Sequence, residues 1–90
     1  MPVILRAGGF TVHIYYPPRE HPPPHVHVRT GKAGEVVIVL GAGGTPPTIR
    51  RRQRGGDIRL EWRALQLVAE HNQYLLRAWR RLHGPLETDL

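Results

Sequence analysis

Three of the six histidines lie in the segment HPPPHVH at residues 21–27. His25 and His27 are two positions apart, so on a β-strand their rings project from the same face, about 6.5–7 Å apart. An imidazole titrates at about pH 6.5, so one ring can take the proton of a 2′-hydroxyl while another protonates the leaving oxygen. The pair therefore predicts metal-independent acid–base chemistry on RNA, with Arg29 holding the phosphate.

The same histidines are also compatible with a structural role and with a metal site. In the structural interpretation, one histidine hydrogen bond pins the proline-rich turn and the remaining rings are solvated. In the metal-site interpretation, His25 and His27 give two ligands to Zn²⁺, and His13, His21 or Glu35 gives a third. The chain has no cysteine, which excludes disulfides, thiolate ligands and cysteine nucleophiles. We expect no cofactor.

Arginine is the second feature that indicates chemistry. It supplies twelve of the thirteen basic residues, and the net charge is +6. Guanidinium groups bind phosphate and carboxylate in a bidentate geometry, so the excess indicates nucleic acid or an acidic protein as a partner, unless it serves only solubility. Four arginines follow a glycine-rich segment: Arg50, Arg51, Arg52 and Arg54. They either contact a phosphate backbone or protect an exposed edge strand from pairing.

Short strands are expected to position these side chains, at about residues 3–6, 10–16, 25–30 and 35–40. The segment 48–53 is either a fifth strand or a loop. Alternation in the second and third strands separates apolar from polar side chains. If those two strands pair, one face holds the polar set His13, Tyr15, His25, His27 and Arg29. His13 and Tyr15 would then assist catalysis, and the apolar face is left to pack on a helix.

The apolar period changes to three and four after Asp57, which is typical of a helix. One long helix is expected at about residues 58–83, with Asp57 as its N-cap and Gly84-Pro85 at its end. A short C-terminal tail follows. The spacing places Trp62 and Trp79 on the core side of this helix. It places His71 and His83 on its surface, with packing of His71 against the sheet edge as an alternative.

The length of 90 residues is enough for one domain, residues 1–90. No apolar run approaches the roughly 20 residues of a membrane-spanning helix, and nothing is typical of a signal peptide. We therefore expect a cytoplasmic protein with no membrane contact. The fold class is predicted to be α+β: a small antiparallel sheet of three to four strands packed against one long C-terminal helix.

Two segments resemble the bacterial domain of unknown function 4160. That family carries an H-x-P-P-H-x-H-V signature, matched here by His21, Pro23, Pro24, His25, His27 and Val28. It also has a C-terminal helix with H-x3-L-x3-W, matched by His71, Leu75 and Trp79. The resemblance extends to the start Met1-Pro2-Val3-Ile4. The chain departs from the family in its arginine-rich segment around residues 41–56 and at Val26, where many members have Phe.

Genes of this family are frequent neighbours of genes for small antitoxin-like partners, so its members are often described as toxins of two-component toxin–antitoxin modules. The resemblance implies a small basic toxin that binds RNA, acts as a ribonuclease, and is neutralised by an acidic antitoxin-like protein. A hypothesis from a different class is a non-catalytic basic module that binds an acidic protein or DNA, in which the histidine–proline segment is structural. Self-association into a homo-oligomer is compatible with both.

Overall fold

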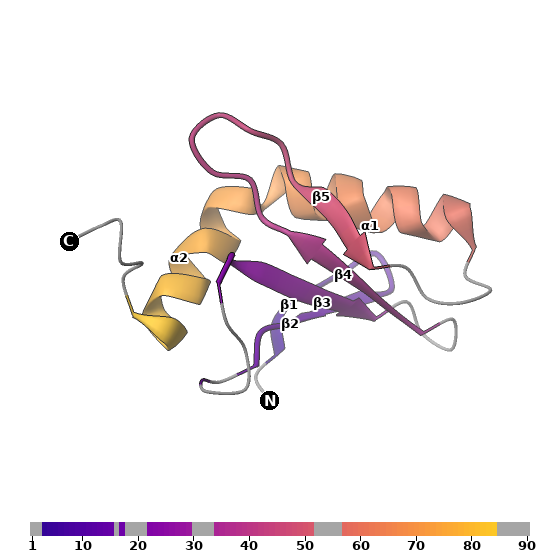
Figure 1. Ribbon diagram of the computed structural model, residues 1–90. Coiled ribbons are helices and arrows are strands. Elements are labelled where there is room, and N and C mark those ends of the chain that lie inside the picture. Colours follow the sequence, from indigo (N-terminus) through magenta and orange to yellow (C-terminus); the bar gives the residue numbers. More distant parts are fainter. Residues whose placement is uncertain (1–2, 16, 18–21, 30–33, 52–56, 85–90) are drawn as a thin grey trace.

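A computed structural model describes residues 3–15, 17, 22–29, 34–51 and 57–84 of the chain. Five strands precede two helices (Figure 1). The strands are Val3–Ala7 (β1), Phe10–His13 (β2), His25–Arg29 (β3), Glu35–Val39 (β4) and Thr48–Arg51 (β5). The helices are Ile58–Glu70 (α1) and Asn72–His83 (α2). None of the described helices is long and apolar enough to cross a membrane.

The sheet is an antiparallel meander in which each strand pairs with the next, in the order β1-β2-β3-β4-β5. The α+β class is confirmed, whereas the expected three to four strands are five, because Thr48–Arg51 pairs with β4. The turn between β1 and β2 is Gly8-Gly9. Both glycines have positive φ angles, 57° and 83°, as a two-residue hairpin turn that matches the strand twist requires.

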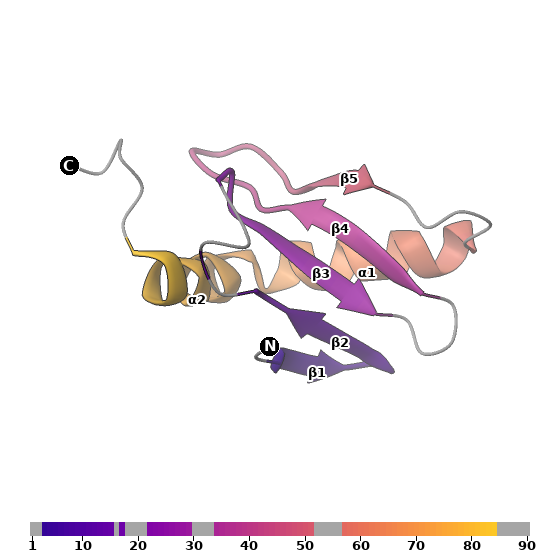
Figure 2. The same cartoon turned by 60° about the horizontal axis from the view of Figure 1, so that its bottom comes forward.

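The strand alternation places apolar side chains on one face of the sheet. The register pairs Val12 with Val28, and Val26 with Ile38. Figure 2 shows both helices on one side of this sheet. Their buried side chains join these strand residues in one apolar core, to which the helices contribute Ala64, Val68, Leu75, Leu76, Ala78 and Trp79. We call this side of the sheet the core face.

The single long helix that the sequence predicts is instead two helices, joined at His71. The sequence at the break contains neither glycine nor proline, and the apolar period continues through it. No local pattern therefore signals the break. Immediately after it, the side chain of Asn72 pairs with the backbone of Gly41, accepting from its N–H and donating to its carbonyl oxygen, each at 2.8 Å. This contact joins residues 31 positions apart, so a helical period could not reveal it.

The helical region begins and ends at the residues that the sequence predicts. Asp57 is the N-cap of α1, and its carboxylate accepts from the Arg59 N–H at 2.8 Å. Gly84 follows the last residue of α2 with a φ of 77°, a conformation that favours glycine. The Gly84 N–H donates to the carbonyl oxygen of Arg80 at 2.7 Å. Pro85 and the C-terminal tail lie outside the described residues.

Two side-chain predictions on the helices are wrong. Trp79 is fully buried as expected, but Trp62 is 58% exposed. Trp62 lies on a different side of α1 from the buried Ala64 and Val68, because two residues along a helix are about 160° away from each other rather than on one face. His83, expected on the surface, is half-buried and contacts the sheet layer through the backbone of Tyr15.

Candidate active site on the histidine face

The second face of the sheet, which lies opposite the helices, carries the polar side chains. Pairing of β2 with β3 sets His13 opposite His27 and Thr11 opposite Arg29. Pairing of β3 with β4 sets Arg29 opposite Glu35. The strand pairing that the sequence left conditional is therefore present, and it brings His13 to His27. We call this surface the histidine face.

The three histidines of this face are buried. His13, His25 and His27 are 5%, 3% and 6% exposed, although both helices lie on the other side of the sheet. The Tyr15 ring contributes to this burial, because it meets the His27 ring edge-on, with centroids 4.5 Å apart and planes at 80°. The part of the structural interpretation in which the remaining rings are solvated is therefore wrong for His13 and His27.

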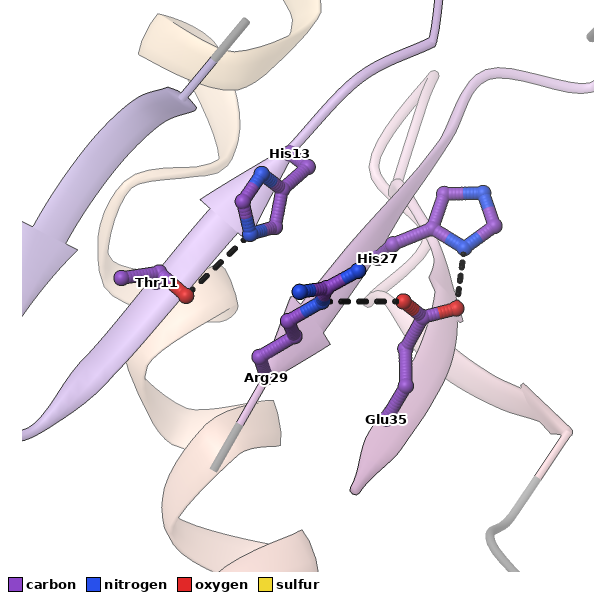
Figure 3. A network of polar contacts seen from close by, with 5 residues as sticks. All are labelled: Thr11, His13, His27, Arg29 and Glu35. Carbon is purple, nitrogen blue, oxygen red and sulfur yellow. Dashed lines mark hydrogen bonds and ion pairs between the residues drawn. The ribbon is translucent and has the colours of Figure 1, made fainter. Parts of the chain in front are cut away.

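His27 forms a carboxylate–imidazole pair with Glu35 (Figure 3). Its Nδ1–H donates to Glu35 Oε1 at 2.8 Å. The other carboxylate oxygen of Glu35 lies 3.6 Å from Arg29 Nε. A carboxylate on Nδ1 fixes the ring orientation and the tautomer, which makes Nε2 the basic nitrogen of the neutral ring. This arrangement suits a general base.

The sequence indicated Glu35 only as a third metal ligand, not as a partner that orients His27. A signal for the pairing does exist in the sequence. His27 and Glu35 lie on the two strands of one β-hairpin. A long side chain on one strand can reach the residue that lies diagonally opposite on the paired strand. The register of β3 and β4, with Arg29 opposite Glu35 and His27 opposite Val37, makes them diagonal.

His25 holds the proline turn at the start of β3. Its Nδ1–H donates to the carbonyl oxygen of Pro23 at 2.8 Å, and the Pro22–Pro23 peptide bond is cis. The hydrogen bond confirms the first part of the structural interpretation, in which one histidine pins the turn. The His25 and His27 ring centroids are 5.5 Å apart, with an angle of 63° between the ring planes. The His25 ring therefore both holds the turn and lies next to His27 in the candidate site.

His13 is poorly suited to carry a proton. Its Nε2 shares a hydrogen bond with Thr11 Oγ1 at 3.2 Å (Figure 3), and its Nδ1 is buried without a hydrogen-bond partner. Burial lowers the pKa of His13, and the positive charge of Arg29 lowers this pKa further. His13 is therefore neutral at pH 7 and supports the site as a neutral ring.

The end of α2 supports the histidine face from the side. The Trp79 ring lies 5.1 Å from that of His25 and stacks on that of His83, with centroids 3.8 Å apart and planes at 4°. The Nε2–H of His83 donates to the carbonyl oxygen of Tyr15 at 2.7 Å. Trp79 and His83 thus position His25 and Tyr15, a role that their helical spacing did not indicate.

A pocket of about 340 Å³ opens beside the histidines. It is lined by His25 and His27 of β3, Val37 of β4, and Arg50 and Arg51 of β5. Neither His13 nor Arg29 lines it, and Arg29 instead contacts Glu35. Arg52, Arg54 and His21, which the sequence also indicated, lie outside the described residues.

A β-bulge explains how two consecutive arginines reach one pocket. Successive side chains of a regular strand point to opposite faces. Between β4 and β5, however, Val37 pairs with Arg51 while the next residue, Ile38, pairs with Ile49. Arg50 is therefore the extra residue of a bulge, which redirects side chains locally. The bulge lets both guanidinium groups border the pocket, where they provide an anion-binding side next to the two imidazoles.

The metal-site interpretation finds no ligand set in the part of the chain that the structure describes. There, no group of three or more His, Asp or Glu side chains is placed to hold a metal ion. His21, one of the expected third ligands, is not among the described residues. The geometry of the pocket is instead that of two imidazoles and two guanidinium groups, which can transfer protons and bind an anion.

Comparison with known proteins agrees with the resemblance seen in the sequence. Neither a curated protein nor a solved structure matches the chain significantly. A family described as Domain of unknown function (DUF4160) matches residues 9–80. That range holds the histidine face, the pocket and most of both helices. Because the match covers well over half of its 90 residues, the chain belongs to the DUF4160 family.

Proposed function

We propose that this protein binds RNA in the pocket of the histidine face and cleaves it without a metal ion, as the toxin of a toxin–antitoxin pair. The observation that carries the proposal is the His27–Glu35 pair, with a 2.8 Å hydrogen bond, beside His25 in a pocket that two arginines also line. The toxin role is the part that the family resemblance implies.

The proposed reaction is an internal transfer at phosphorus. His27 Nε2 takes the proton of the ribose 2′-hydroxyl, and the resulting oxygen attacks the adjacent phosphorus. His25, in its protonated form, gives a proton to the 5′-oxygen as its bond to phosphorus breaks. The products are a 2′,3′-cyclic phosphate and a free 5′-hydroxyl, and the reverse proton transfers restore both rings during hydrolysis of the cyclic phosphate.

The arginines have the role that the sequence assigned to Arg29. Arg50 and Arg51 would bind the phosphate and stabilise the charge that develops on its oxygens. Arg29 would instead hold Glu35 in place, through their 3.6 Å contact. DNA lacks the 2′-hydroxyl, so the reaction would be confined to RNA even though DNA can enter an arginine-lined pocket.

The experiment is cleavage of end-labelled RNA in EDTA by the wild type and by three variants. His27→Gln is expected to slow cleavage by about 10²- to 10⁴-fold, since it removes a placed base. Glu35→Gln is expected to slow it less, because the base stays but loses its orienting charge. His71→Gln is the matched control: His71 lies on the helical side, with its Nδ1–H donating to Leu67, and its change should leave the rate unaltered.

Binding tests the arginines separately. Each phosphate contact on a single strand contributes about 0.7 to the slope of log affinity against log salt. The double variant Arg50→Ala/Arg51→Ala should therefore lower that slope by about 1.4 and weaken binding of RNA of any sequence. An unchanged slope would place the RNA elsewhere on the molecule.

A second candidate function is a non-catalytic basic module that binds an acidic protein or DNA. The hydrogen bond from His25 to Pro23, and the burial of His25, favour it, because both are what a purely structural histidine needs. This candidate predicts that His25→Ala lowers the melting temperature with no change in any phosphate chemistry. Intact RNA with folded wild-type protein would favour this second function over the first.

A further inference from the structure

A second hollow lies in the helical layer, away from the histidine face. The β4–β5 connection forms one side of it with Pro46 and Pro47, and α1 forms the other side with Trp62, Leu65 and Ala69. The hollow has a volume of about 390 Å³. We call it the α1 groove. Its lining is mainly hydrocarbon, in contrast to the imidazole and guanidinium lining of the pocket in the histidine face.

Helix α1 has two apolar stripes: the inner one is buried in the core, and the outer one touches the core only through the partly buried Leu65. Ala64 and Val68, both fully buried, belong to the inner stripe. The outer stripe is Ile58, Trp62, Leu65 and Ala69, spaced by four, three and four residues. Within the outer stripe Ile58 is 54% exposed and Trp62 is 58% exposed. A largely exposed apolar stripe of this kind marks an interaction site, and tryptophan is enriched at the positions that contribute most binding energy.

Two arginines flank the outer stripe. Arg59 and Arg63 are exposed and lie four residues apart, so they are neighbours on the helix surface. Arg63 also lines the α1 groove. Two exposed carboxylates belong to this helix in the described residues: the N-cap Asp57, which accepts from the Arg59 N–H, and Glu70 at the far end. Neither lines the groove. The groove therefore combines apolar walls with a positive border.

This combination favours one kind of occupant. A second copy of the chain would bring together two molecules of net charge +6 and add its own Arg59 and Arg63 to the same interface, without supplying a cluster of carboxylates in return. Nucleic acid would satisfy the arginines and could stack one base on Trp62, but it would gain little from the remaining aliphatic and proline walls. A protein segment that has both carboxylates and a large apolar side chain satisfies both parts of the surface.

We propose that the α1 groove binds an acidic protein segment. The segment inserts an apolar side chain between Pro47 and Trp62, and its carboxylates pair with Arg59 and Arg63, whose guanidinium groups can bind them in a bidentate geometry. The groove is separate from the histidine face, so this inference does not depend on RNA cleavage. A protein bound there leaves the pocket that Arg50 and Arg51 line accessible.

The test is to select binders of the wild-type protein from a displayed library of random peptides. The peptides are 13 residues long, so that a helical peptide matches the length of α1. The expected result is enrichment of peptides with net negative charge and at least one large apolar residue. Trp62→Ala should weaken their binding by at least tenfold, and so should the charge reversal Arg59→Glu/Arg63→Glu. Trp62 is exposed, so its variant is expected to keep the wild-type circular dichroism spectrum.

Matched controls come from α2, away from the groove. Tyr74→Ala removes another exposed aromatic side chain, 43% exposed in the wild type, and Arg77→Glu reverses another exposed arginine. Neither should change the affinity of the selected peptides by more than about twofold. An equal loss with Arg77→Glu would show that overall charge, rather than the α1 groove, binds the peptides. An equal loss with Tyr74→Ala would show that their binding is not specific to Trp62. Either result would overturn the proposal.

Several further outcomes overturn the proposal as well. Enriched peptides that are neutral or basic would do so, and so would the absence of enrichment, or binding that Trp62→Ala leaves intact. A dimer in sedimentation that Trp62→Ala dissociates would assign the groove to a second copy of the chain. Oligouridine that binds the wild type but not Trp62→Ala would assign it to RNA. Loss of RNA cleavage on His27→Gln bears on none of these outcomes, so the two proposals fail independently.

Discussion

The two faces of the sheet are buried to similar extents by different means. On the core face, Val26 and Ile38 are fully buried beneath the helices. On the histidine face, His13, His25 and His27 are only 3–6% exposed although the helices pack on the opposite face, and the Trp79 ring at the end of α2 reaches His25 from the side. The core face is closed by hydrocarbon packing, whereas the histidine face is closed by rings and by directional hydrogen bonds.

The difference separates stability from chemistry. Full burial of a large apolar side chain contributes about 1.5–3 kcal/mol, whereas a typical hydrogen bond contributes a net of about 0.5–1.5 kcal/mol. The core face should therefore dominate the free energy of unfolding. The histidine face contributes less, but it holds titratable groups at fixed positions, as acid–base chemistry needs. Substitutions on the two faces should thus affect different measurements.

The largest expected loss of stability comes from a substitution in the apolar core that covers the core face. Trp79→Ala should lower the free energy of unfolding by about 3–5 kcal/mol, because Trp79 is fully buried and leaves a cavity. Urea unfolding followed by circular dichroism measures this change. The control Trp62→Ala removes an equally large but 58% exposed side chain and should cost far less. Similar losses for the two variants would contradict the assignment of Trp79, and not Trp62, to the core.

A smaller effect is expected where the helical layer is joined to the sheet. Asn72→Ala should lower the free energy of unfolding by about 1–3 kcal/mol, because it leaves the polar backbone groups of Gly41 without their side-chain partner. Gln73→Ala, at the neighbouring exposed position, is the control. If the two variants melt at the same temperature, the Asn72–Gly41 contact is not what anchors α2.

The smallest expected effect is a pH dependence of the histidine face. Burial and the charge of Arg29 lower the pKa of His13 below its ordinary 6.5, against an opposing contribution from Glu35. The unfolded chain then binds more protons than the folded one. This contribution to stability is present above about pH 6.5 and is lost as the pH falls through 6.5 toward the folded pKa.

Urea midpoints measured from about pH 7.5 down to about pH 5, a range that spans the ordinary histidine pKa, check this sign. The wild type should lose stability on acidification, and His13→Gln should lose less over the same range. Thr11→Val is a useful companion, since it removes the partner of His13 Nε2 without removing the titrating ring. A His13→Gln variant with the full wild-type pH dependence would show that other groups cause it.

The sequence by itself determined the two-faced sheet and the caps. Alternation in Phe10–His13 and His25–Arg29 sorts valines to one side and histidines to the other, because side-chain direction in a strand is a local property of the backbone. The start of α1 at Asp57 and the end of α2 at Gly84 are likewise local, since a cap satisfies backbone groups within one turn. Each of these predictions needs only a few adjacent residues.

Only the tertiary structure decided the rest. The break at His71 is followed by a contact between Asn72 and a backbone segment far away in the chain. The choice of Trp79 over Trp62 for the core depends on which side of each helix meets the sheet. The phosphate-binding role of Arg50, in place of Arg29, remains a proposal that depends on a bulge in the pairing with β4. Register, bulges and helix docking are set by contacts between distant segments, and no local pattern contains them.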